Sequence, residues 1–126
     1  MADLPPVVAV VDDNLMFISR VELQLREHGF AAKVFSLAPP TAADLQRLAP
    51  AAVLVNVASR AWAPLELIRM LKAELPAAPV IAYAGHKETD LHTAAREAGA
   101  DVTAANSMIS GNLGAALRDA GVPMSE

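Results

Sequence analysis

The sequence predicts an α/β domain in which a doubly wound, five-stranded parallel sheet is flanked by five helices. Apolar runs without polar alternation, such as VVAVV at 7–11, are typical of strands that are buried on both faces. Segments whose apolar residues lie four apart alternate with these runs at the spacing of βαβ units. At 126 residues the chain has the length of one domain.

The first strand runs directly into a pair of carboxylates, Asp12 and Asp13. Apolar residues four apart then predict a helix over Leu15–His28, with Asn14 as its N-cap and Gly29 as its stop. Because ligands bind beyond the carboxyl ends of the strands in open parallel sheets, the two carboxylates lie where a site is expected.

The remaining elements follow from the same reasoning. Thr41 and Asp44 form a capping box at the start of a helix, and Pro64 suits the first position of another. Ser107 or Ser110 is expected to cap the last helix, which ends near Ala120. The expected strands are Ala32–Phe35, Ala52–Val57, Val80–Ala84 and Asp101–Ala105, and the expected helices are Ala42–Ala49, Leu65–Leu75 and Thr89–Ala98.

Composition excludes several classes of function. The formal net charge is −4 and the ten basic residues are scattered, which argues against a nucleic-acid partner. There is no cysteine, and the three histidines lack the spacing of zinc motifs. The N-terminus has no signal-peptide pattern, and no apolar run reaches the ~20 residues of a membrane span. We therefore expect a cytoplasmic protein without a membrane partner.

Four motifs together carry a family resemblance: VVDDN, VLVN, PVIAYAGH and GADVTAAN. With them the sequence resembles the receiver domain of bacterial response regulators, the CheY-like superfamily of two-component signal transduction. The resemblance covers nearly the whole chain and implies a flavodoxin-like fold with strand order 2-1-3-4-5. It implies a single receiver-like domain over residues 1–126, which is either a whole protein or the N-terminal domain of a longer one.

In that family, two acidic residues after the first strand help to hold Mg²⁺, and an aspartate ending the third strand accepts a phosphoryl group. The acidic pair falls on Asp12 and Asp13 and is intact. The phosphoacceptor position falls on Asn56, whose neutral amide oxygen is a poor nucleophile. Mg²⁺ is therefore not expected to bind tightly and no cofactor is predicted, although a residual metal site at Asp12 and Asp13 stays open.

Two further positions of the phosphorylation site have also changed. The hydroxyl position after the fourth strand falls on Ala84, and the lysine position after the fifth falls on Asn106. The aromatic switch position of the family falls on Thr103. Phosphoryl transfer needs a nucleophilic oxygen, a divalent cation and a positive group. The losses therefore favour a degenerate pseudo-receiver.

The acidic pair has other interpretations that the residues leave open. Carboxylates at a helix N-terminus are stabilised by the helix dipole, and this alone could account for Asp12 and Asp13. If no metal binds there, the two carboxylates repel each other, and the amide nitrogen of Asn56 or the guanidinium of Arg60 could satisfy them.

Two surfaces are candidate partner sites. Leu15 and Met16 lie just off the core-facing stripe of the first helix. Either they are exposed, as apolar residues at an interface often are, or they pack under neighbouring loops. The resemblance adds the face of the fourth helix, fifth strand and fifth helix, which would carry His92, Arg96, Thr103, Arg118 and Asp119. A kinase, an output domain, another regulator or a second copy of the chain could bind there.

We expect a phosphorylation-independent protein-interaction module. The alternative is a sensor in which a metal ion or small ligand in the former phosphorylation pocket replaces phosphorylation as the switch. An enzyme is not expected, because the sequence has no nucleophile–base pair.

Overall fold

A computed structural model of the chain describes residues 4–124. Its five strands lie parallel in one sheet with the order β2-β1-β3-β4-β5, as predicted. The strands are β1 Val7–Val11, β2 Ala31–Phe35, β3 Ala52–Asn56, β4 Val80–Ala84 and β5 Val102–Ala105. The helices are α1 Leu15–Glu27, α2 Ala42–Leu48, α3 Pro64–Glu74, α4 Thr89–Ala98, α5 Asn106–Gly111 and α6 Leu113–Asp119.

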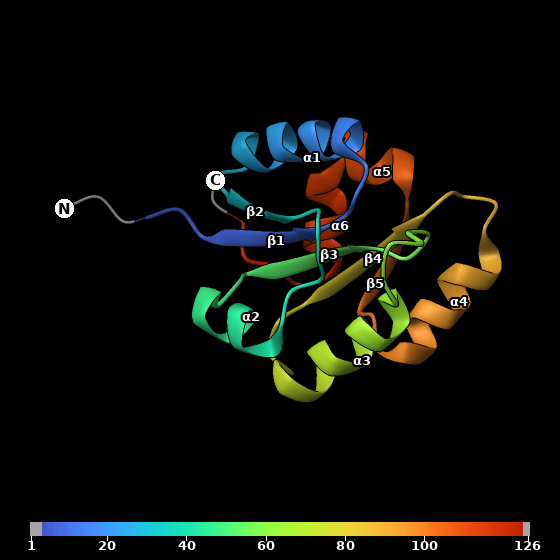
Figure 1. Cartoon of the computed structure of the whole chain (residues 1–126). Coiled ribbons are helices and arrows are strands. Elements are labelled where there is room, and N and C mark those ends of the chain that lie inside the picture. Colours follow the sequence, from blue (N-terminus) through green and yellow to red (C-terminus); the bar gives the residue numbers. More distant parts are fainter. Residues whose placement is uncertain (1–3, 125–126) are drawn as a thin grey trace.

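Helices cover both faces of the sheet (Figure 1): α1, α5 and α6 lie on one face, and α2, α3 and α4 on the other. The strands therefore bury side chains in both directions. In β1, Val8 and Val10 join the core beneath α1, whereas Ala9 and Val11 join the core beneath α3. This arrangement is why the strands carry unbroken apolar runs and confirms the doubly wound sheet.

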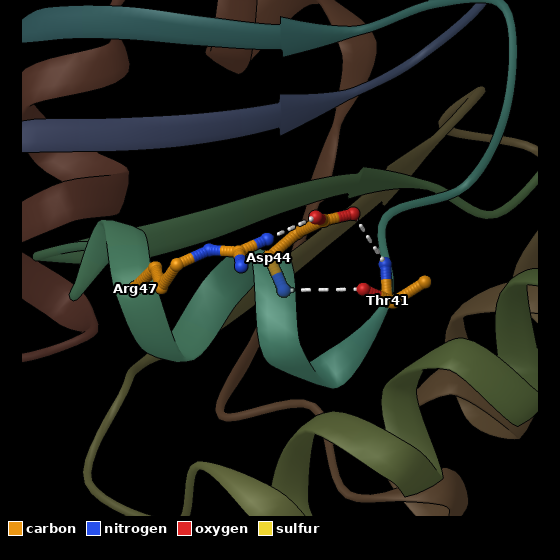
Figure 2. A network of polar contacts seen from close by, with 3 residues as sticks. All are labelled: Thr41, Asp44 and Arg47. Atoms are coloured by element: carbon orange, nitrogen blue, oxygen red, sulfur yellow. Dashed lines mark hydrogen bonds and ion pairs between the residues drawn. The ribbon is translucent and has the colours of Figure 1, made fainter.

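Side-chain caps fix the helix starts that the sequence predicted. The side chain of Asn14 accepts a hydrogen bond from the Phe17 N–H at the start of α1. At α2, the Asp44 N–H donates to Thr41 Oγ1 and the Thr41 N–H donates to Asp44 Oδ2, each at 3.1 Å (Figure 2). The Thr41 N–H, together with Arg47 at 3.1 Å, holds the pKa of Asp44 below its ordinary value.

The end of the chain differs from the prediction of five helices, because the last helix is broken in two. Asn112 has φ −149° and ψ 54°, which ends α5 and separates it from α6. Gly111 and Asn112 are poor helix formers, and the Leu113 N–H finds an acceptor outside the helix, Gln24 Oε1 of α1 at 3.2 Å.

The predicted serine cap of the last helix is also wrong, because α5 begins at Asn106 and its N-cap, Ala105, makes no side-chain hydrogen bond. By contrast, the bounds of the nine elements from β1 to β5 lie within one residue of those predicted. Within residues 4–124, no helix is long and apolar enough to cross a membrane.

Candidate functional site

The candidate site lies where β1, β3 and β4 end. Asp12 follows β1, Asn56 closes β3, and the register of the parallel pair places Asn56 opposite Tyr83 of β4. Since adjacent parallel strands end at the same edge of the sheet, these three side chains come from distant parts of the sequence to one point.

Asp12 is the centre of this cluster and is completely buried. Its Oδ1 accepts hydrogen bonds from the Asn14 N–H at 2.9 Å and from Asn56 Nδ2 at 3.0 Å. Its Oδ2 accepts a third from the Tyr83 hydroxyl at 2.7 Å. A buried carboxylate is costly unless donors compensate it, and here both oxygens have donors from the protein itself.

Asn56 uses both ends of its amide. While Nδ2 donates to Asp12, Oδ1 accepts from the Ala58 N–H at 2.9 Å. The hypothesis that the Asn56 nitrogen satisfies an acidic neighbour is therefore confirmed. Arg60 does not take this role, because within the described residues it forms no ion pair with Asp12 or Asp13.

Tyr83 is the member of the cluster that the sequence interpretation missed. Its side chain is fully buried, and its ring stacks on Phe17 with the centroids 5.4 Å apart. Burial raises the pKa of Tyr83 well above its ordinary value, and the charge and hydrogen bond of Asp12 and the charge of Asp13 add to the rise. The available signal was a lone tyrosine at the end of an apolar strand, one residue before Ala84.

The other positions of the predicted site stand apart from this cluster. Asp13 is exposed, and Asn106 is exposed at the start of α5. Ala84 is completely buried and pairs with Ala105 of β5. Among the hydrogen bonds of residues 4–124, none joins Asp13 or Asn106 to Asp12.

The donor set does not fit the Mg²⁺ ion that the resemblance implies. A hard cation needs free oxygen ligands, whereas Asp12 faces an amide nitrogen and a hydroxyl that already donate to it. In the part of the chain that is described, no three side chains from Asp, Glu, His or Cys are grouped so that they could hold a metal ion.

The predicted face of α4, β5 and the last helix contains two hydrogen bonds that the structure shows. Arg96 Nη2 of α4 donates to Thr103 Oγ1 of β5 at 3.0 Å, and His92 Nε2 donates to the Gly85 carbonyl at 3.1 Å. Arg118 lies on α6, in the opposite helix layer, where its Nη2 approaches Gly114. Asp119, beside Arg118 on α6, is exposed, and the role of this face in partner binding stays a prediction.

Of the two alternatives for the apolar residues at the start of α1, the structure shows that they are exposed. Leu15 is 69% exposed and Met16 is 77% exposed. Leu23, two turns after Met16, is also exposed, so the apolar surface runs along the helix.

Comparison with solved structures identifies the fold. A response regulator from Thermotoga maritima has a TM-score of 0.78 and 24% identity, covering 93% of this chain and 98% of its own. The response regulator DrrB, also from Thermotoga maritima, has a TM-score of 0.73 and 25% identity, covering 90% of this chain and 51% of its own. The signal receiver domain of a modulated diguanylate cyclase from Desulfovibrio desulfuricans has a TM-score of 0.74 and 19% identity, covering 94% of each chain.

No family model and no curated protein sequence matches the chain. Sequence identity is low throughout, yet the structural matches cover most of the chain. The chain therefore has the receiver fold of response regulators, with the flavodoxin-like topology that the sequence predicted.

Proposed function

We propose that this chain is a pseudo-receiver, a phosphorylation-independent protein-interaction module of a two-component-type signalling system. The observation that carries the proposal is the closed hydrogen-bond cluster at Asp12. Asn56, to which the resemblance assigns the phosphoacceptor position, donates to Asp12, to which it assigns a metal ligand.

The chemistry of phosphoryl transfer supports this proposal. An acyl phosphate needs a carboxylate nucleophile, whereas the amide of Asn56 is neutral and both its ends are hydrogen-bonded. Ala84 has no hydroxyl for the phosphoryl oxygens, and Asn106 has no positive charge to neutralise them. We accordingly assign the chain no catalytic activity.

The alternative, a metal ion or small ligand acting as the switch, has less support. A ligand in the former phosphorylation pocket would have to break the hydrogen bonds that Tyr83 and Asn56 donate to Asp12. Leaving a buried carboxylate without a donor costs about 1–3 kcal/mol or more, which the ligand would have to repay.

The test treats the purified chain with a phosphoryl donor and, separately, with a mimic of the phosphoryl group. Acetyl phosphate or beryllofluoride with millimolar Mg²⁺ should leave the amide NMR spectrum unchanged, and mass spectrometry should find no added phosphate. An active receiver treated in parallel shows that the reagents work. Incorporation of phosphate, or saturable shifts around Asp12 and Asn56, would overturn the proposal, and shifts with Mg²⁺ alone would favour the ligand-switch alternative.

A further inference from the structure

We propose that α5 opens as a unit, moving away from the sheet while β5 and α6 on either side of it stay in place. The opened form is a second conformation that the chain reaches without phosphorylation. The inference goes beyond the proposed function, because it concerns the stability of one segment and not the chemistry at Asn56. It starts from how little holds α5 to the rest of the molecule.

A single buried side chain anchors α5. Ile109 is the residue of this helix that is completely buried, and four others are exposed: Asn106, Ser107, Met108 and Gly111. Within residues 4–124, no side chain of α5 takes part in a hydrogen bond or an ion pair. Segments with few buried contacts are the ones that open at low free energy, while the rest of a protein stays folded.

The two other short helices have what α5 lacks. The seven residues of α2 begin with the capping box of Thr41 and Asp44. The seven residues of α6 include four that are buried: Leu113, Gly114, Ala116 and Leu117. In α5, which has six residues, the N-cap Ala105 forms no side-chain hydrogen bond and Gly111 weakens the last turn. Such a short helix is not stable by itself in water, so its few tertiary contacts decide whether it stays closed.

The neighbours of α5 are held by contacts that do not involve it. Before the helix, β5 ends at Ala105, which pairs with Ala84 of β4. After it, the break at Asn112 separates α5 from α6, and the Leu113 N–H donates to Gln24 Oε1 of α1 at 3.2 Å. Leu113 is also completely buried. Since both ends are fixed in this way, α5 can detach without unwinding β5 or α6.

The surface beneath α5 belongs to the core that contains Tyr83. The helix contacts α1, β4 and β5, and Figure 1 shows it beside the start of α1. Ile109 joins the same cluster of buried residues as Ile18, Tyr83 and Ala104. Opening α5 therefore exposes part of this core to water. A partner that binds the open or the closed form more tightly shifts the balance between the two.

Native-state hydrogen exchange of the whole chain, followed by NMR in urea below the unfolding transition, tests the opening. The Asn112 N–H donates to the Met108 carbonyl at 2.7 Å and closes the last turn of α5. This amide should be protected from exchange at least about ten-fold less than the amides of β4. Its exchange should also depend little on urea, because opening α5 exposes far less surface than global unfolding. Protection equal to that of β4, with the same dependence on urea, would overturn the proposal.

Two matched substitutions show whether α5 opens as a unit. Ile109 of α5 and Ile68 of α3 are both completely buried. Ile109→Val should speed the exchange of the α5 amides about two- to ten-fold, because it weakens the contact that closes the helix. Ile68→Val should leave these amides unchanged, because Ile68 stays packed when α5 opens. Equal acceleration by both variants would mean that α5 opens only with the whole protein, and no effect of Ile109→Val would mean that its end only frays. Either result would contradict opening as a unit.

Thiol labelling gives an independent measurement, because the chain has no cysteine. Ile109→Cys and Ala116→Cys each place a thiol at a completely buried position, on α5 and on α6. A buried thiol reacts with an aromatic disulfide reagent only after it is exposed. Relative to the unfolding constant of each variant, measured with urea, Ile109→Cys should react at least about ten-fold faster than Ala116→Cys. Equal relative rates would contradict the opening of α5. They would leave the proposed function standing, since neither measurement uses a phosphoryl donor.

Discussion

At the scale of single residues, the phenol of Tyr83 completes the hydrogen-bond cluster around Asp12. Its hydroxyl is the donor to Asp12 Oδ2, at 2.7 Å in a completely buried position. Tyr83→Phe keeps the ring and its stack on Phe17 but leaves this oxygen without a donor. We expect the free energy of unfolding to fall by about 1–3 kcal/mol, measured by urea denaturation.

Thr103→Val is the matched control for Tyr83→Phe. It also removes a hydroxyl that forms a hydrogen bond, but the partner, Arg96, lies at the surface. This variant should change the free energy of unfolding by no more than about 0.5 kcal/mol. Equal effects of the two substitutions would contradict the special role of the buried phenol.

The raised pKa of Tyr83 makes a second prediction. Its folded-state pKa lies above the ordinary value of 10.0, so the unfolded chain loses this proton first as the pH rises. The resulting contribution to stability is complete below pH 10.0 and is lost at higher pH. The chain has one tyrosine, so phenolate absorbance reports this group alone, and it should appear together with unfolding. Ionisation of the folded protein near the ordinary value would contradict the prediction.

The residues of the site differ in how far the sequence could predict their positions. Asp12 and Asn56 were predicted to lie at one edge of the sheet because each ends an apolar run and parallel strands end together. Their hydrogen bond was one of several interpretations that the sequence left open. Tyr83 was missed because apolar periodicity treats a tyrosine in a buried strand as one more apolar residue. Its partner lies 71 residues away, and only the register of the sheet brings the hydroxyl to Asp12.

At the scale of elements, the strands were predictable and the last helix was not. Local signals such as the Thr41–Asp44 capping box depend on neighbouring residues and identified helix starts correctly. The break at Asn112 depends on Gln24 of α1, which supplies an acceptor from the other end of the chain. No local pattern in the sequence contains that contact.

The contact between α1 and α6 gives a prediction for the two glycines near the break. A Cβ added at Gly114 would lie 2.7 Å from Cε1 and 2.8 Å from Nε2 of His28, at the end of α1. The far end of the His28 side chain would have to move, so Gly114→Ala should lower the free energy of unfolding slightly, by up to about 1 kcal/mol, although alanine is the better helix former.

Gly111→Ala is the matched control, because a Cβ at Gly111 would meet nothing within 4 Å. It should leave stability unchanged or raise it by a few tenths of a kcal/mol, since alanine restricts the unfolded chain. Thermal unfolding of the two variants gives the comparison. If both shift the midpoint in the same direction, the α6 helix does not pack against His28 as closely as described.

At the scale of the whole molecule, the fold and the hydrogen-bond cluster at the strand ends depend on different residues. Most residues of the three central strands, β1, β3 and β4, are apolar and buried, so they are constrained by the core. The residues at the strand ends are constrained mainly by one another. Replacing Asn56 alone should therefore change the pocket without changing the fold.

The Asn56→Asp variant tests this separation of fold and chemistry. The new carboxylate would lie where an amide nitrogen now contacts Asp12 Oδ1 at 3.0 Å, and two carboxylates at that distance repel each other. Without metal the variant should unfold at a lower temperature than the wild type. Millimolar Mg²⁺ should then raise its unfolding temperature, because three carboxylates, with Asp13, can hold the cation and ligand binding stabilises the folded state. The wild-type chain and an Asn112→Asp control should not respond to Mg²⁺. A variant that Mg²⁺ fails to stabilise would contradict the assignment of Asn56 to the phosphoacceptor position.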